Sequence, residues 1–162
     1  MLTDIRHTLA RYLTEPAVQI LAKTRLSPNA LTVLGFALSI AIAWILALGH
    51  LFLGGFLVLF SGWFDLIDGA LARATGRTTR FGALLDSTLD RLGEAALLFG
   101  LLFYYLRQNA FQESLLIFAV LVGSVMVSYI RARAEGLGLE SQVGLFTRPE
   151  RVVLLALGLT LS

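Results

Sequence analysis

The chain has 162 residues, of which 57% are hydrophobic and only 15% are charged, with a mean hydropathy of +0.78 and a formal net charge of +2. Soluble domains usually carry about 25% charged residues, so this composition is typical of a membrane protein, and no nucleic-acid partner is expected. Cysteine is absent, which excludes disulfides, thiolate metal sites and a cysteine nucleophile.

The first predicted element lies in residues 3–24, where Ile and Leu recur at helical intervals with Arg and Lys between them. This pattern predicts an amphipathic helix lying on the membrane surface, within an N-terminal segment of residues 1–26. A soluble linker is the alternative. Residues 27–162 are predicted to form the transmembrane domain, and no cleavable signal peptide is expected before it.

Five apolar segments follow, and they predict an all-α integral membrane protein. A helix needs about 20 residues to cross the bilayer, and the first four segments are long enough. The fifth offers only a short apolar run, about 15 Å of helix, before the sequence stops. We expect a bundle of about five transmembrane helices, truncated at its C-terminus. The segments are 29–48, 51–74, 81–106, 113–134 and 149–161.

The second and third apolar segments each carry two aspartates, Asp65 and Asp68 in one and Asp86 and Asp90 in the other. The spacings of three and four residues place each pair on one helix face. Ionisable groups at membrane depth are costly, so they indicate a functional site. Four clustered carboxylates repel one another unless cations neutralise them, and oxygen ligands suit Mg²⁺, Mn²⁺ or Ca²⁺. These four residues are therefore the predicted metal ligands.

The basic residues predict which side of the membrane this site faces. With the N-terminus in the cytoplasm, all but one of the 13 Lys and Arg residues fall at cytoplasmic helix ends, and only Arg107 lies outside. Cytoplasmic flanks are enriched in Lys and Arg. The four aspartates then lie toward the cytoplasmic side of an inner membrane, where a water-soluble substrate and a lipid can meet.

Three interpretations of the aspartates compete. One is structural, with the carboxylates paired to nearby arginines, although a cluster of four exceeds that need. Another is an ion or proton conduit, although the outer halves of the helices are almost without polar residues. The third is metal-assisted phosphoryl transfer, in which two metal ions about 4 Å apart hold a pyrophosphate. Gly69 and Gly82 favour it, because they leave space for a large ligand.

The residues around the aspartates resemble the signature of the CDP-alcohol phosphotransferases, D-x-x-D-G-x-x-A-R, eight residues, then G-x-x-x-D-x-x-x-D. Every fixed position of the signature is met in residues 65–90. Intramembrane prenyltransferases also use aspartate-rich helices with Mg²⁺, but they lack the Gly-x-x-Ala-Arg continuation. The matching residues are Asp65, Asp68, Gly69, Ala72, Arg73, Gly82, Asp86 and Asp90.

This resemblance implies a membrane enzyme, a homodimer of six-helix subunits, that transfers a phosphatidyl or similar group from a CDP-linked donor to an alcohol and releases CMP. It implies that the four aspartates bind two Mg²⁺ or Mn²⁺ ions and that Asp90 takes the proton of the acceptor hydroxyl. It also assigns CDP binding to Asp65, Asp68, Gly69, Ala72, Arg73 and Gly82.

A second basic cluster closes the fourth segment and opens the fifth. Arginine binds phosphate with two parallel hydrogen bonds, so the cluster predicts a pocket for a phosphorylated acceptor. The alternative is a basic membrane flank. The sequence looks most like the phosphatidylinositol-phosphate synthase branch, which joins CDP-diacylglycerol to inositol 1-phosphate, although that branch commonly has lysine at the first of these positions. Glycerol 3-phosphate as acceptor and an archaeal lipid as donor are the alternatives. The cluster is Arg131, Arg133, Arg148 and Arg151.

Overall fold

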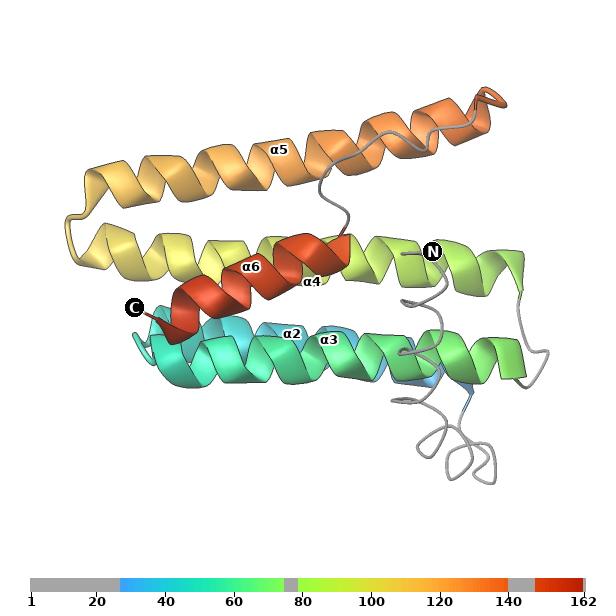
Figure 1. Cartoon of the computed structure of the whole chain (residues 1–162), viewed down its shortest axis with the longest axis horizontal. Coiled ribbons are helices and arrows are strands. Elements are labelled where there is room, and N and C mark those ends of the chain that lie inside the picture. Colours follow the sequence, from blue (N-terminus) through green and yellow to red (C-terminus); the bar gives the residue numbers. More distant parts are fainter. Residues whose placement is uncertain (1–26, 75–78, 140–147, 162) are drawn as a thin grey trace, which may run out of the picture.

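The computed structural model describes residues 27–74, 79–139 and 148–161, and these residues form five helices and no strand. Each helix begins and ends within two residues of a predicted apolar segment, so the all-α prediction is confirmed. The predicted amphipathic helix in residues 1–26 lies outside the described residues. The helices are α2 (Pro28–Ala47), α3 (Leu51–Ala74), α4 (Arg80–Arg107), α5 (Phe111–Gly136) and α6 (Arg148–Thr160) (Figure 1).

Two helix starts are fixed by local sequence. The Ser27 hydroxyl accepts a hydrogen bond from the Ala30 N–H at 3.2 Å, and Pro28 occupies the first helical turn, where its missing N–H costs nothing. The Thr79 hydroxyl accepts a hydrogen bond from the Gly82 N–H at 2.9 Å and caps α4 in the same way. The start of α4 is thus defined just before its two aspartates.

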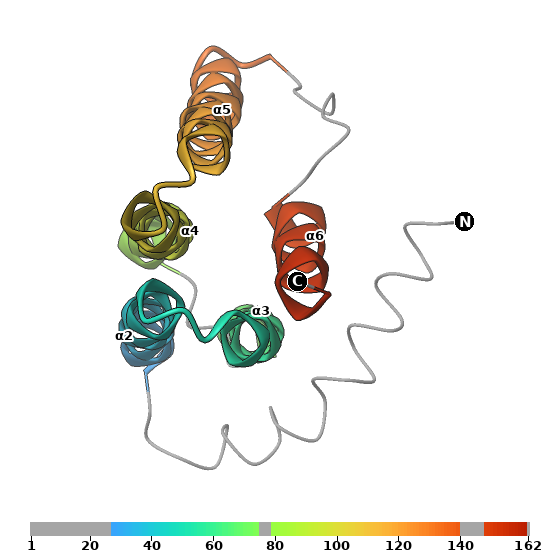
Figure 2. The ribbon, with the colours of Figure 1, turned by 90° about the vertical axis from the view of Figure 1, so that its left-hand side faces the viewer.

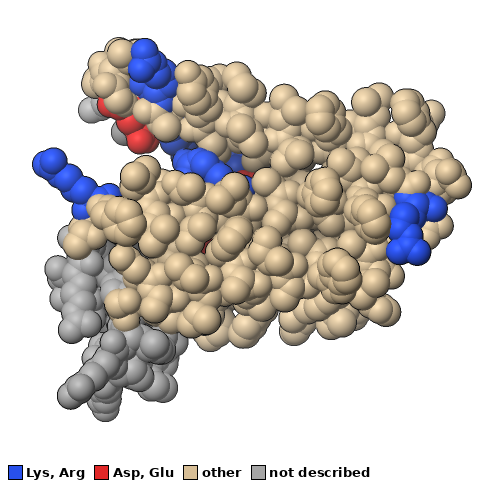
Figure 3. Space-filling model, turned by 180° about the vertical axis from the view of Figure 1, so that it is seen from behind, with Lys and Arg blue, Asp and Glu red and all other residues tan. Residues whose placement is uncertain are grey.

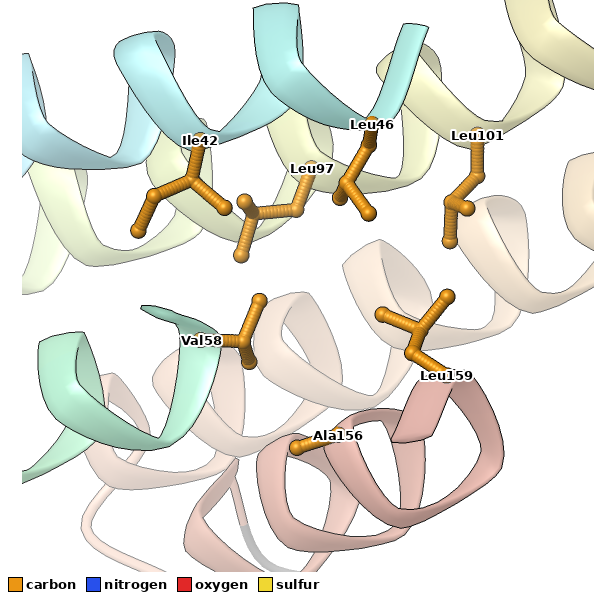
Figure 4. Packing of buried hydrophobic residues seen from close by; sticks show 7 residues of the cluster. All are labelled: Ile42, Leu46, Val58, Leu97, Leu101, Ala156 and Leu159. Carbon is orange, nitrogen blue, oxygen red and sulfur yellow. The ribbon is translucent and has the colours of Figure 1, made fainter. Parts of the chain in front are cut away.

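The helices form a bundle in which α2 packs against both α3 and α4, α5 lies against α4, and α6 lies against α3 (Figure 2). Buried apolar side chains from α2, α3, α4 and α6 meet in one cluster (Figure 4). This cluster holds together helices that are far apart in the sequence. Its members are Ile42, Leu46, Val58, Leu97, Leu101, Ala156 and Leu159.

The outer surface of the bundle is apolar. Trp44, Phe52 and Phe111 are each at least 70% exposed. Figure 3 shows one face of the molecule that is mostly uncharged, with charged side chains gathered toward one end and in the hollow beside it, and one basic patch at the other end. Among the described residues, Asn29–Ala47 and Phe111–Gly136 are long and apolar enough to cross a membrane by length and composition. The prediction of membrane-capable helices is therefore confirmed, whereas the number of spans stays a prediction.

Candidate active site

Asp86 and Asp90 line a pocket between three helices. They lie one turn apart on α4, so both carboxylates point to the same side of that helix. The pocket has a volume of about 230 Å³. Acidic side chains of α4 face basic side chains of α5 and α6 across it. Its lining residues are Asp86, Ser87, Asp90, Arg91, Glu94, Val127, Ser128, Arg131 and Arg151.

The aspartates of α3 are described less fully. α3 is helical through Ala74, so its backbone places Asp65 and Asp68 on one face as predicted. The Asp65 carboxylate points toward α2, because a Cβ built on Gly35 would lie 3.3 Å from Asp65 Oδ1. The side chains of residues 66–74 are not described, so the predicted contacts of Asp68, Gly69, Ala72 and Arg73 with metal or CDP stay predictions.

The predicted metal site has suitable donors, but its complete set lies partly outside the described side chains. Asp86 and Asp90 offer carboxylate oxygens on one helix face, as a hard divalent cation requires. Among the described side chains, no three acidic, histidine or cysteine groups come close enough to hold a metal ion. The fourth carboxylate, Asp68, is not among them. The four-carboxylate ligand set therefore stays a prediction.

Gly82 lies where the first turns of α4 and α2 meet. A Cβ built on Gly82 would lie 3.0 Å from Asn29 Oδ1 and 3.0 Å from Thr79 Oγ1. A side chain at this position would thus displace two polar groups at the start of both helices. Asn29, which was not predicted as a site residue, is therefore next to the glycine that the signature assigns to CDP binding.

The four predicted acceptor arginines are only partly brought together. Arg131 of α5 and Arg151 of α6 both line the pocket beside Asp86 and Asp90. Arg131 makes no hydrogen bond or ion pair with any described residue. Arg133 is exposed and is not among the lining residues, and the side chain of Arg148 is not described. The pocket thus unites one arginine from each of the two predicted helix ends.

Glu94 was missed in the sequence, although it stands four residues after Asp90 on the same face of α4. It is only 9% exposed and forms a two-point ion pair with Arg151. Arg151 Nε donates to Glu94 Oε1 at 2.9 Å, and Arg151 Nη2 donates to Glu94 Oε2 at 3.0 Å. A carboxylate within a predicted membrane segment is the same signal that indicated the four aspartates. That signal applied equally to Glu94.

Arg91 is a further lining residue that was not predicted to act in the site. Its guanidinium donates a hydrogen bond to the Ser87 carbonyl oxygen one turn earlier on α4. This bond holds the side chain along its own helix. The pocket therefore contains three arginines and three carboxylates, and Arg151 forms an ion pair with one of these carboxylates, Glu94.

Comparison with known proteins gives consistent matches over nearly the whole chain. The sequence profile of the family described as CDP-alcohol phosphatidyltransferase matches residues 25–161. The phosphatidylinositol phosphate synthase of Mycobacteroides abscessus is 38% identical over 161 residues, which cover 97% of this chain and 72% of that protein. The archaetidylinositol phosphate synthase of Pyrococcus horikoshii is 36% identical over 156 residues, which cover 96% of this chain and 80% of that protein.

Solved structures agree with these sequence matches. The crystal structure of the Mycobacterium tuberculosis phosphatidylinositol phosphate synthase with CDP-DAG bound superposes with a TM-score of 0.84 at 38% identity, over 91% of this chain and 75% of that one. A second crystal structure of that enzyme, in complex with manganese and citrate, gives a TM-score of 0.81 over 91% of this chain and 71% of that one. Fold and sequence therefore point to the same group of proteins.

Proposed function

The chain belongs to the CDP-alcohol phosphatidyltransferase family, and from this premise we propose that it transfers a phosphatidyl group from CDP-diacylglycerol to inositol 1-phosphate and releases CMP. The observation that carries the proposal is the pocket itself. Acids of α4 and arginines of α5 and α6 face each other there, so an alcohol and its phosphate have separate partners within one volume. The similar enzymes named for inositol phosphate products favour the same acceptor.

Asp90 takes the proton of the acceptor hydroxyl in this proposal. The hydroxyl oxygen forms a bond to the phosphorus that carries diacylglycerol, the bond from that phosphorus to the CMP oxygen breaks, and the proton ends on the Asp90 carboxylate. Asp86 lies one turn away and lines the same pocket. Arg131 and Arg151 bind the acceptor's phosphate on the opposite side, which holds the hydroxyl near Asp90.

Two Mg²⁺ or Mn²⁺ ions are part of the proposal, and the manganese complex of the similar mycobacterial enzyme supports it. Bound ions supply charge stabilisation for the pyrophosphate of the donor. The residues that would hold them are Asp65, Asp68, Asp86 and Asp90. The signature glycines Gly69 and Gly82, with Ala72 and Arg73, make room for and contact the CDP part of the donor.

We further propose that the five helices form one transmembrane domain with the pocket on the cytoplasmic side. Exposed apolar side chains around the bundle support a lipid environment, because a soluble protein rarely leaves so large an apolar surface uncovered. Arg131 and Arg151 lie at the pocket, while Arg107 ends α4 at the opposite end. We also propose that residues 1–26 form an amphipathic helix on the membrane surface and that the protein is a homodimer.

A panel of acceptors tests the function. The protein in detergent or liposomes is incubated with CDP-diacylglycerol, Mg²⁺ and either inositol 1-phosphate, glycerol 3-phosphate, inositol or no acceptor, and CMP release is measured. We expect release with inositol 1-phosphate, and a CDP-linked archaeal lipid in a parallel arm tests the donor. CMP release with glycerol 3-phosphate but not with inositol 1-phosphate would show that glycerol 3-phosphate is the acceptor. If no acceptor leads to CMP release and the protein conducts ions in liposomes, the result would favour the alternative that the aspartates line an ion or proton conduit.

A further inference from the structure

Glu94 carries a charge that the proposed chemistry does not use, at a place where a charge is costly. Its side chain is 9% exposed and sits between the polar end of α4 and the apolar cluster that includes Leu97 and Leu101. A buried carboxylate is tolerated only when a cation and hydrogen bonds compensate for the lost water. The Arg151 guanidinium provides both, through two parallel contacts of 2.9 and 3.0 Å.

The ion pair crosses a gap between two helices whose backbones stay apart. In the described ranges, no Cα atom of α4 comes within 8 Å of a Cα atom of α6, and α6 packs against α3 instead. The guanidinium of Arg151 therefore reaches the pocket by extending away from its own helix. Glu94 holds it there, because two hydrogen bonds to one carboxylate fix both the position and the plane of a guanidinium.

Arg131 stands in a different situation on the far side of the pocket. It has no hydrogen bond or ion pair with any described residue, although it lines the same volume as Arg151. One arginine of the pocket is thus paired with an acid, whereas the other has no such partner among the described residues. A guanidinium carries five N–H donors, and the pair with Glu94 uses two of them, so pairing with Glu94 does not by itself exhaust the donors of Arg151.

We propose that Glu94 is a positioning residue for the acceptor: it holds Arg151 in the pocket so that Arg151 and Arg131 together bind the acceptor's phosphate. This inference rests on the proposed function. Its competitor is a purely structural role, in which the ion pair only ties α6 to α4. The two roles differ in what removal of the charge changes. Loss of positioning weakens binding of the acceptor alone, whereas loss of a tie between helices lowers stability and affects both substrates.

The test compares wild type with Glu94→Gln, Arg151→Gln and the double variant, with separate KM values for acceptor and CDP-diacylglycerol. We expect Glu94→Gln to raise the acceptor KM by about ten- to hundredfold, the range seen when a group that orients a metal ligand is removed. The KM of the donor stays within about twofold. Because Glu94 acts through Arg151, the double variant is no worse than Arg151→Gln, a non-additivity typical of coupled residues.

Two further variants keep the test decisive. Glu113→Gln removes an exposed acid from the first turn of α5 and is the charge-matched control, with both KM values unchanged. Glu94→Asp retains the charge on a shorter side chain and should recover part of the acceptor binding, and it also replaces Glu94→Gln if that variant does not fold. The unfolding midpoint of each variant is recorded alongside.

Several results would overturn the inference. An unchanged acceptor KM in Glu94→Gln, or an equal increase for both substrates, would leave Glu94 a structural tie. Effects of Glu94→Gln and Arg151→Gln that simply multiply in the double variant would show that Glu94 does not act through Arg151. Each of these results is meaningful only when the wild-type protein releases CMP with the acceptor. A wild type that releases no CMP with any acceptor would instead overturn the proposed function, and the inference with it.

Discussion

Gly100 lies where α4 meets α2, and its replacement by alanine tests how closely these helices approach. A Cβ at this position would lie 2.3 Å from the Ala43 carbonyl oxygen, 2.9 Å from the carbonyl carbon and 3.0 Å from the Cα. These are backbone atoms, so no change of rotamer relieves the contact. The two helices must move apart until the shortest distance exceeds 3.0 Å. Overpacking of this kind costs about 1–3 kcal/mol.

Gly123→Ala is the matched control, because a Cβ there would meet nothing within 4 Å. Both variants make the same substitution inside a helix and gain the same helix propensity, about 1 kcal/mol. The difference between them therefore isolates the steric cost at Gly100. For a chain of this size, 1 kcal/mol shifts the unfolding midpoint by about 2–4 °C, so Gly100→Ala should unfold about 2–12 °C below Gly123→Ala.

The midpoints are measured on purified protein in detergent, by the fluorescence of the tryptophans during heating. Gly100→Ala should also lose CMP release, because α4 carries Asp86 and Asp90 and moves relative to α2. Equal midpoints for the two variants would refute the close approach of Gly100 and Ala43. An unfolding midpoint for Gly100→Ala above that of the control would refute it still more directly.

The remaining predictions concern the chemistry. EDTA should abolish CMP release, and Mg²⁺ or Mn²⁺ should restore it. Ca²⁺ should bind without supporting turnover, because its looser coordination misplaces the phosphates. Full activity without metal would contradict this prediction. Asp90→Asn should lower kcat by about 10²–10⁴ and spare binding of the CDP-lipid better than Asp65→Ala does; normal turnover would place the base elsewhere. Arg131→Gln should raise the acceptor KM by about one to two orders of magnitude, since a charge-assisted hydrogen bond contributes about 1.5–3 kcal/mol and 1.4 kcal/mol is tenfold. Arg107→Gln at the opposite end is its control, and equal weakening of both substrates by Arg131→Gln would argue against a phosphate pocket.

The helices could be predicted from the sequence because their signals are local. Ser27 before Pro28 and Thr79 before α4 are caps whose partners lie three residues away. The shared face of Asp86 and Asp90 follows from helix geometry alone, and the pocket confirms it. The number of membrane spans could not be established in this way, since α4 and α6 carry charged residues, of which Asp86, Asp90 and Arg151 line the pocket.

The basic cluster shows that two side chains close in sequence need not line the same pocket. Arg131 and Arg133 were grouped because they are close in sequence, yet residues two apart on a helix point in different directions. Helix geometry therefore already favours one of them for the pocket, and the structure has Arg131 there while Arg133 is exposed. The helical spacing that places Asp86 and Asp90 on one face directs Arg131 and Arg133 to different sides of α5.

The pairing of Glu94 with Arg151 could not be deduced from the sequence. The two residues are 57 positions apart and belong to helices whose described Cα atoms stay more than 8 Å apart. Only the tertiary arrangement, with α6 held on α3 by the apolar cluster, brings Arg151 across the gap to α4. Local patterns thus placed Asp86 and Asp90 on one helix face, whereas the pairing of Glu94 with Arg151 required the fold.

The central claim is that one pocket brings the carboxylates of α4 and the arginines of α5 and α6 to the same substrate. It is tested most directly by the anomalous and difference density of crystals grown with Mn²⁺ and inositol 1-phosphate. We expect manganese peaks beside Asp86 and Asp90, and the acceptor's phosphate between Arg131 and Arg151. Manganese bound away from these aspartates, or a phosphate bound outside the two arginines in a crystal that contains both ligands, would contradict the account.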